Sequence, residues 1–347
     1  MGEKHSVRFE PVGIEIEVDE EQTILRAAAE QGVMLMHGCK EGQCASCKSF
    51  ILDGEDVEHD RYSTFALPDF EKEEGFTLLC RAHAYEDLTV ELLNYDEEMI
   101  HSGLPIQTAV AEVVANDNVT HDMRHLVLKL IEPAALKYFP GQYLDFTIPG
   151  TTETRSFSMA GIPDAEAGVL EFVVKIYPGG LFSQFLDTKV AVGDRLEITG
   201  PFGVFTLRDA PDRSLVFLGG GAGMAPILAL LRSMADRGIH RKATFYYGAR
   251  RRRDLCFEEE LRAMERTLPG FTYVPALSEP GDDGWTGETG LITDVVRRRE
   301  SDLAGADAYV CGPPPMVEAA LDLLPALGVE DRRIFYDKFT TTGDADE

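Results

Sequence analysis

The fold of this chain is decided by the stretch GCKEGQCASC at residues 38–47, to which Cys80 is added further along the sequence. Its cysteines, Cys39, Cys44 and Cys47, have the spacing C-x₄-C-x₂-C, and the fourth is distant. This is a spacing of thiolates that bind a [2Fe–2S] cluster. Small residues fill the loop, because its backbone has to curl around a cluster and aim N–H groups at the sulfurs. The sequence therefore predicts a protein that moves electrons one at a time.

The surroundings of these cysteines favour metal binding over disulfides. The chain has no apolar run of membrane-spanning length and no signal-peptide pattern, so we expect a soluble, cytoplasmic protein without membrane contact. Clustered cysteines in such a chain indicate a metal or catalysis. Disulfides and a structural zinc ion remain as alternatives, although zinc sites more often use paired C-x₂-C motifs. Cys256 has no motif around it and is expected to be structural.

The charge of the chain argues against one class of partner and suggests another. A net charge of −27 argues against nucleic acid. Residues 1–100 contain 24 Asp and Glu against 8 Lys and Arg, so the part with the clustered cysteines is the more acidic. An ordinary solvated surface explains this excess, and so does steering toward a basic patch on a protein partner. Both interpretations stay open.

The residue pattern divides the chain into three domains and a linker, as its length of 347 residues leads us to expect. Residues 1–97 predict a hairpin, a helix over residues 24–31 capped by Thr23, and short strands around the cysteine loop. Residues 98–106 break the pattern and are expected to be a linker. Residues 107–211 read as closely spaced strands, which predicts a barrel or sandwich. Residues 212–347 alternate strands and helices, which predicts a doubly wound parallel sheet.

A second motif, GGGAGMAP at residues 219–226, is typical of a nucleotide-binding turn. It follows a strand and opens a helix, so its backbone can approach a pyrophosphate whose charge the helix N-terminus stabilises. Pro226 suits the first helical turn, but it replaces the third glycine of the usual fingerprint. No acidic residue ends the next strand to bind a ribose hydroxyl, and arginines 250–253 stand there instead. A tight turn without a ligand is the alternative.

Two further motifs complete a resemblance to the ferredoxin–NADP reductase superfamily. RSFSM at residues 155–159 looks like its flavin-binding R-x-[YF]-S motif, and CGPPPM at residues 311–316 resembles its C-G-P-x-x-M signature. The turn at residues 221–226 looks like its nicotinamide-nucleotide turn. The cysteine spacing resembles that of plant-type ferredoxins, and the whole chain resembles reductase components of bacterial multicomponent oxygenases. Residues 62–67, 79–83 and 92–96 look most like reductases of soluble diiron monooxygenases of the propane and methane types.

The resemblance implies a multidomain α+β and α/β protein. Its parts would be a β-grasp [2Fe–2S] ferredoxin domain over residues 1–97, an antiparallel six-stranded FAD-binding β-barrel over residues 107–211, and a doubly wound NAD(P)-binding domain over residues 212–347. It also implies that NADH passes a hydride to FAD and that single electrons leave through the cluster to a diiron hydroxylase docked on the acidic ferredoxin domain. The alternatives are the reductase of a Rieske-type dioxygenase and a non-enzymatic, zinc-stapled nucleotide-binding module.

The resemblance assigns residues to the flavin. Arg155 would pair with the pyrophosphate, since a planar guanidinium matches two oxygens. Phe157 would lie against the isoalloxazine and Ser158 near its N5, while Phe339 would cover the ring; core packing is the alternative for both aromatics. The residues expected to bind FAD are Arg155, Ser156, Phe157, Ser158, Val174, Lys175, Gly179, Gly180, Ser183 and Phe339. A simple turn before a helix is the alternative for residues 179–183.

The resemblance also assigns residues to the nicotinamide nucleotide: Gly219, Gly220, Gly221, Gly223, Met224, Pro226, Arg250, Cys311, Gly312, Pro313 and Met316. Cys311 would lie at the nicotinamide end of the cleft and, with Ser158 and Phe339, act at the reacting atoms; a buried strand thiol is its alternative. The arginines at residues 250–253 could bind the 2′-phosphate of NADPH, clamp the adenosine of NADH, or form a solvated loop. Reductases of this group imply NADH, with NADPH as the other possibility.

Overall fold

The computed structural model describes residues 2–97, 99–151, 153–164, 168–282 and 284–339, which fall into two compact units. The N-terminal unit holds the residues up to Ile106, and the C-terminal unit runs from Gln107 to Phe339. The predicted linker begins at residue 98 and the predicted third domain ends at residue 347, so these two bounds lie outside the described residues. Along the described parts of the chain, no helix is both long and apolar enough to cross a membrane.

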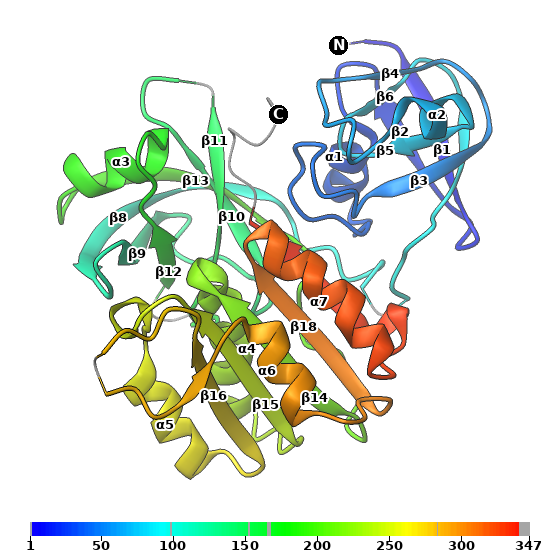
Figure 1. Ribbon diagram of the computed structural model, residues 1–347. Coiled ribbons are helices and arrows are strands. Elements are labelled where there is room, and N and C mark those ends of the chain that lie inside the picture. Colours follow the sequence, from blue (N-terminus) through cyan, green and yellow to red (C-terminus); the bar gives the residue numbers. More distant parts are fainter. Residues whose placement is uncertain (1, 98, 152, 165–167, 283, 340–347) are drawn as a thin grey trace. The chain divides into compact units, whose positions relative to one another are not determined.

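The N-terminal unit is a mixed sheet with a short helix packed against it (Figure 1). The strand order is β2-β1-β7-β3-β5, in which β1 pairs antiparallel with β2 and parallel with β7. The elements are β1 (Lys4–Glu10), β2 (Ile14–Asp19), α1 (Ile24–Glu30), β3 (Lys48–Asp53), β4 (Val57–His59), α2 (Asp69–Glu73), β5 (Phe76–Leu78), β6 (Ala82–Ala84) and β7 (Leu88–Glu91), with β4 and β6 forming a separate pair. This arrangement confirms the predicted β-grasp fold.

Helix α1 begins at the predicted residue and supports the cysteine loop. The amide of Arg26 donates to the hydroxyl of Thr23, which caps the helix. The apolar face of α1 is buried in a core that also contains Phe9 and two of the clustered cysteines, Cys47 and Cys80. The loop that carries the cysteines therefore rests on a packed core, which restricts where their sulfurs can lie.

The predicted linker is partly packed onto the N-terminal unit. Ile100 is 2% exposed and belongs to the same core as α1. Its carbonyl accepts a hydrogen bond from the amide of Met34 at 2.9 Å. A Cβ on Gly103 would lie 2.3 Å from the carbonyl oxygen of Gly32, which shows how closely this stretch approaches the end of α1. The segment free to act as a linker is therefore shorter than the sequence pattern predicts.

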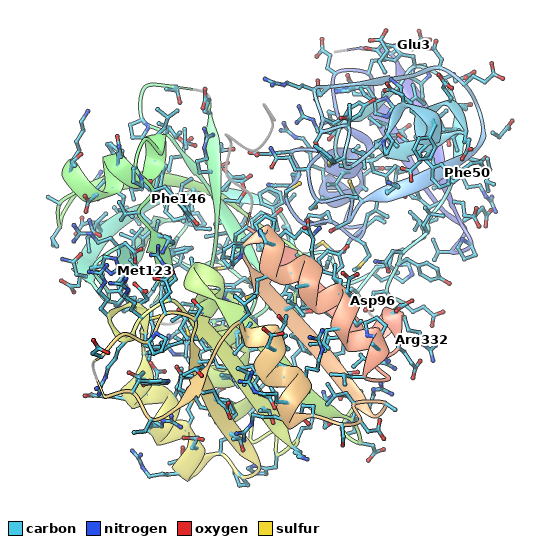
Figure 2. The ribbon with its side chains drawn as sticks, in the orientation of Figure 1. Glu3, Phe50, Asp96, Met123, Phe146 and Arg332 are labelled. Atoms are coloured by element: carbon cyan, nitrogen blue, oxygen red, sulfur yellow. The ribbon has the colours of Figure 1, made fainter. Side chains whose placement is uncertain are left out.

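The first half of the C-terminal unit is an antiparallel barrel. The strand order is β11-β10-β13-β8-β9-β12, and a bridge between Met159 and Phe172 joins the two ends. The elements are β8 (Gln107–Asn118), β9 (Met123–Glu132), β10 (Tyr143–Thr147), β11 (Thr154–Ser158), β12 (Val169–Lys175), α3 (Leu181–Thr188) and β13 (Arg195–Phe202). Phe146, labelled in Figure 2, packs edge-on against Phe172 and Phe182 in the barrel core. The predicted six-stranded barrel is confirmed.

The second half is a parallel sheet with the strand order β17-β16-β15-β14-β18-β19. Helices α4 and α5 cover one face and α6 and α7 the other (Figure 1). The elements are β14 (Ser214–Gly220), α4 (Met224–Asp236), β15 (Ala243–Ala249), α5 (Glu258–Thr267), β16 (Phe271–Leu277), β17 (Glu288–Thr289), α6 (Ile292–Arg299), β18 (Ala306–Gly312), α7 (Pro314–Ala326) and β19 (Ile334–Lys338), with 3₁₀ turns at Gly221–Gly223, Arg252–Asp254 and Asp331–Arg333. This confirms the doubly wound sheet. Its strand order reverses at β14, so the ends of β14 and β18 form the crevice in which such folds bind ligands.

A buried ion cluster lies at the amino ends of the parallel strands, opposite the crevice. Asp307, on β18, has no exposed surface. Its carboxylate accepts hydrogen bonds from Arg241 at 2.6 Å and from Arg213 at 2.8 Å. Arg241 is itself almost completely buried, and it also donates to the carbonyl of Arg208 at 3.0 Å. These contacts attach the segment that leaves the barrel to the start of the parallel sheet.

Candidate functional site

The four cysteines of the first motif come together in the structure. Cys39, Cys44 and Cys47 lie between α1 and β3, and Cys80 follows β5. All four except Cys39 are buried. The amide of Leu79 donates to the carbonyl of Cys47 at 3.3 Å and ties the two segments. A hydrogen bond with Cys47 and burial raise the pKa of Cys80 well above its ordinary value. Thiolates this close need a positive centre between them, so the donor set fits a metal cluster.

The loop curls so that backbone amides point at sulfur. Glu41 and Gln43 donate their amides to the Sγ of Cys39 at 3.4 and 3.3 Å. Lys40, Gly42 and Ala45 take left-handed backbone conformations, with φ between 57° and 70°. Amides directed at sulfur stabilise the negative charge of a thiolate-bound cluster. The geometry thus supports the predicted role of the loop.

Two of the predicted flavin segments, β11 and the start of α3, contact each other. Phe157 on β11 contacts Phe182 on α3, with ring centroids 5.0 Å apart. Helix α3 starts at Leu181, and no side chain of the described residues caps it. Its first amides are therefore available to a phosphate, as the adjoining Gly179-Gly180 turn leads us to expect. These features fit the predicted roles of α3 toward the flavin phosphates and of β11 toward the flavin ring.

A pocket of about 320 Å³ opens at the carboxyl ends of the parallel strands. Its lining comes from the glycine-rich turn, from the ends of β15 and β16, and from both halves of the C-terminal unit. The lining residues are Met123, Lys175, Tyr177, Gly220, Gly221, Ala222, Gly248, Ala249, Arg250, Asp254, Ser278, Gly290, Leu291, Ile292, Pro313, Met316 and Phe339. We call this the nucleotide pocket.

The nucleotide pocket adjoins the flavin segments. Tyr177 lines it, and the amide of Tyr177 donates to the hydroxyl of Ser183 on α3 at 3.2 Å. At the glycine-rich turn, a Cβ on Gly223 would lie 2.1 Å from the carbonyl oxygen of Cys311, so only glycine lets α4 approach β18 this closely. Because Tyr177 lies in the pocket lining and also contacts α3, a nucleotide in the pocket would lie beside a flavin on the barrel.

Three protein families match successive parts of the chain. A 2Fe-2S iron-sulfur cluster binding domain matches residues 7–85, an oxidoreductase FAD-binding domain residues 110–207, and an oxidoreductase NAD-binding domain residues 217–322. The reductase component of propane 2-monooxygenase from Mycolicibacterium goodii is 49% identical, over 98% of this chain and 99% of its own length. The corresponding component from Rhodococcus jostii is 50% identical, over 98% and 93%.

The chain belongs to the family of oxygenase reductase components. The solved structure of the Amycolatopsis cytochrome P450 reductase GcoB is similar, with a TM-score of 0.84, 31% identity and coverage of 97% of this chain and 99% of that one. The family matches confirm the predicted [2Fe–2S], FAD and NAD-binding domains and replace the zinc alternative. The protein is an oxidoreductase of this reductase family.

The predicted site residues of this reductase fall into two groups. Lys175, Gly220, Gly221, Arg250, Pro313, Met316 and Phe339 line the nucleotide pocket. The other predicted nucleotide residues, Gly219, Gly223, Met224, Pro226, Cys311 and Gly312, lie outside its lining. The Cys311 thiol has no exposed surface, and burial raises its pKa, which favours the alternative interpretation as a buried strand thiol; its role toward the nicotinamide stays a prediction.

The flavin residues divide in a similar way. Val174 is completely buried in the barrel core, so its side chain is a packing residue and only its backbone remains for the flavin. Phe157 packs against the same core and is partly exposed. Ser158 is buried, whereas Ser156 is exposed and donates to Asp145 at 2.6 Å. Their roles toward the flavin, like that of Arg155, stay predictions.

The motifs missed part of the pocket. Tyr177, Ser278, Leu291 and Ile292 line it but belong to no motif. Ser278 follows β16, and its position at the carboxyl end of a parallel strand is a signal that could have found it. Tyr177 and the start of α6 reach the pocket only through tertiary packing.

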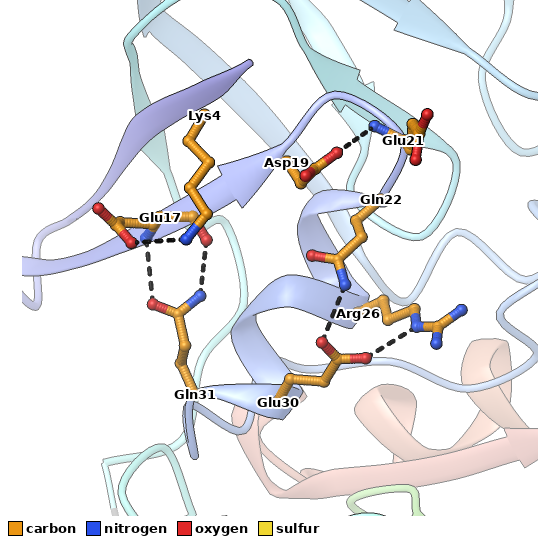
Figure 3. Close-up of a pocket in the computed structure, with 8 residues that line it drawn as sticks. All are labelled: Lys4, Glu17, Asp19, Glu21, Gln22, Arg26, Glu30 and Gln31. Carbon is orange, nitrogen blue, oxygen red and sulfur yellow. Dashed lines mark hydrogen bonds and ion pairs between the residues drawn. The ribbon is translucent and has the colours of Figure 1, made fainter. Parts of the chain in front are cut away.

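A second hollow, of about 580 Å³, lies on the N-terminal unit (Figure 3). It is lined by Lys4, Glu17, Asp19, Glu21, Gln22, Arg26, Glu30 and Gln31. Its charged groups pair with one another, as Lys4 does with Glu17 at 3.1 Å and Arg26 with Glu30 at 2.9 Å. Because its own side chains satisfy these groups, we assign no ligand to it.

Replacing Gly42 by alanine is expected to lower the iron content of the purified protein. A Cβ at this position would lie 2.6 Å from the Cβ of Tyr62, and a left-handed φ costs an L-residue about 1–2 kcal/mol. Iron per chain and visible absorption measure the effect. Gly32→Ala is the matched control, because Gly32 also has a positive φ but open space around it. Normal iron content in Gly42→Ala would contradict the account of the loop.

Tyr247 forms a hydrogen bond with the glycine-rich turn. Its buried hydroxyl donates to the carbonyl of Gly221 at 3.0 Å and lies 3.4 Å from the Sγ of Cys256. Gly221 has a left-handed φ of 55°. The hydrogen bond from Tyr247 holds the carbonyl of Gly221 in place. Cys256 thus supports a residue of the turn, which agrees with its predicted structural role.

Tyr247→Phe is expected to raise the KM for NADH about fivefold, because one hydrogen bond that positions the turn is worth about 1 kcal/mol. Flavin content should not change, since Tyr247 lies on β15 and not in the barrel. Steady-state dye reduction measures KM. Tyr273→Phe is the matched control: that hydroxyl is also buried, on the neighbouring strand, but has no hydrogen-bond partner among the described residues. Equal changes in both variants would refute the positioning role.

Proposed function

We propose that this protein is the NADH-dependent reductase of a soluble diiron monooxygenase that resembles propane 2-monooxygenase. One observation carries the proposal: four relatives named propane 2-monooxygenase reductase components are 47–50% identical over 98% of the chain. Relatives named as dioxygenase components are only 30–33% identical over similar lengths. The Rieske-type partner is therefore the second candidate.

Within the proposed function, FAD would supply acceptance of a hydride from NADH, and a [2Fe–2S] cluster held by the four cysteines would supply one-electron transfer. The chain's own residues bind and orient these groups. The glycine-rich turn and Arg250 hold the nucleotide, and Phe339 lies in the lining of the same pocket. The amide of Phe339 donates to the carbonyl of Gly312 at 2.9 Å, which fixes the end of β19 beside β18.

The proposed partner is a diiron hydroxylase that docks on the N-terminal unit. Residues 1–100 carry a large excess of acidic over basic side chains. A basic patch on the hydroxylase would be attracted to this surface, and the attraction would fall with added salt. We also assign the protein to the cytoplasm, a reducing compartment in which cysteines remain available as cluster ligands.

Rapid mixing with candidate oxygenases tests the proposal. The reductase, reduced by NADH, should transfer electrons to a diiron hydroxylase of the propane monooxygenase type, and high salt should slow the transfer. A Rieske-type oxygenase should accept electrons more slowly under the same conditions. Faster transfer to the Rieske protein would support the second candidate, and transfer that is unaffected by salt would refute docking on an acidic surface.

A further inference from the structure

An aspartate of the barrel pairs with two cations that line the nucleotide pocket. Asp122 lies in the loop between β8 and β9, and its Oδ2 is 2.6 Å from the Nζ of Lys175 and 3.5 Å from a guanidinium nitrogen of Arg250. Both of these cations line the nucleotide pocket. Burial alone would raise the pKa of Asp122, but the hydrogen bond and charge of Lys175 lower it below the ordinary value. Asp122 is therefore ionised at neutral pH.

The other groups around Arg250 complete a balanced set of charges. Arg250 lies 3.8 Å from Asp254, and Arg251 lies 3.5 Å from Glu279. Together with Lys175 and Asp122, these groups make three cations and three carboxylates, of which Lys175, Arg250 and Asp254 line the pocket. The amide of Glu279 donates to the carbonyl of Arg250 at 2.8 Å, so the acidic and basic segments are held side by side.

Asp254 is fixed rather than free to move away. Its Oδ2 accepts a hydrogen bond from the amide of Arg251 at 2.8 Å, and its Oδ1 lies 3.3 Å from the Nδ1 of His121. His121 precedes Asp122 in the same barrel loop. Two successive residues of that loop therefore reach the segment that follows β15.

The position of these charged groups after the second strand of the sheet decides which part of a bound nucleotide they would meet. In doubly wound nucleotide-binding folds, the group that follows the second strand meets the adenosine ribose, where an acidic residue accepts the 2′-hydroxyl of NAD and an arginine accommodates the 2′-phosphate of NADP. Arg250 directly follows β15, the second strand of this sheet, and lines the pocket. Its guanidinium would be the phosphate ligand if it were not already paired with carboxylates.

We propose that Asp122 is a specificity-determining residue that makes the pocket select NADH over NADPH by occupying Arg250. A 2′-phosphate adds a charge of about −1.5 to −2. It would enter a set whose cations are already neutralised, and it would meet the carboxylates of Asp122, Asp254 and Glu279 at close range. NADH brings no such charge. The inference rests on the proposed use of NADH and adds the residue that enforces it from the opposite domain.

Asp122→Asn is the direct test, because it removes the charge and nearly preserves the shape. The ratio of kcat/KM for NADPH to that for NADH should rise about tenfold, mainly through the KM for NADPH. Binding of adenosine 2′,5′-bisphosphate relative to 5′-AMP, measured by calorimetry without turnover, should rise by a similar factor. Asp122→Glu should keep the selectivity of the parent.

Two further variants separate specific from general effects. Asp212→Asn makes the same change of charge on an exposed residue that precedes β14, at the end of that strand away from the pocket, and should leave both ratios unchanged. Adding Arg250→Gln to Asp122→Asn should remove the gain, since the freed guanidinium is the proposed phosphate ligand. An unchanged ratio in Asp122→Asn, or a gain that persists in the double variant, would overturn the inference. Failure of NADH to reduce the flavin of the parent would instead refute the proposed function.

Discussion

Cys44→Ser is expected to abolish electron delivery to a one-electron protein acceptor such as cytochrome c, while NADH oxidation by a dye that takes electrons from the flavin continues. Cys44 is a buried member of the four-cysteine group, and removing one thiolate leaves the cluster without a complete set of ligands. The loss should exceed the roughly 100-fold seen when supporting residues of metal sites are removed. Parallel assays with cytochrome c and with the dye measure it.

The division of the chain explains why the two assays should separate. Cys44 belongs to the N-terminal unit, whereas the flavin segments and the nucleotide pocket lie in the C-terminal unit. Flavin content and the melting of the C-terminal unit serve as controls for folding. Loss of dye reduction together with cytochrome c reduction, in a variant that keeps its flavin, would show that the cluster is not the exit for electrons.

Asp307→Ala is expected to lower the free energy of unfolding of the C-terminal unit by about 3–5 kcal/mol, because it leaves a buried cation without its partner. Arg241 is 5% exposed and 2.6 Å from the carboxylate. Denaturant titration followed by flavin release and circular dichroism measures the change.

An exposed ion pair in the same unit is the matched control for Asp307→Ala. Asp294 and Arg297 are 3.3 Å apart on α6, with about half or more of each side chain exposed. Asp294→Ala should cost only about 0.3–0.5 kcal/mol. Comparable losses in the two variants would show that the Asp307 cluster does not brace the sheet.

Local pattern was sufficient for much of the fold. Residues that are close in sequence determine the alternation in β1 and β2 and the hydroxyl cap of Thr23. They also determine the alternation of strands and helices after Ser214. Among the elements that escaped prediction are β4, β6, β17 and α2, whose two to five residues are too few to show a period. Ile100 escaped for another reason: a single apolar residue in an aperiodic stretch does not reveal that it inserts into a core.

The site was predictable where a motif carries the chemistry and hidden where tertiary contacts do. The cysteine loop and the glycine-rich turn follow from their spacing. The motif did not show that the side chain of Cys311 points into the core, since that depends on which face of β18 the helices cover. Asp122 is distant in sequence from its partner Arg250, and Tyr247 is distant from its partner Gly221. Their effects arise from tertiary contacts that no local pattern records.

Anaerobic titration with NADH, followed by visible absorption and electron paramagnetic resonance, shows whether electrons from NADH reach both the flavin and the cluster. FAD stores two electrons and a [2Fe–2S] cluster one, so the account predicts that about 1.5 equivalents of NADH per chain reduce both, with the resonance signal of a reduced cluster appearing. Uptake that stops at one equivalent, with a cluster that is present but stays oxidised, would contradict it.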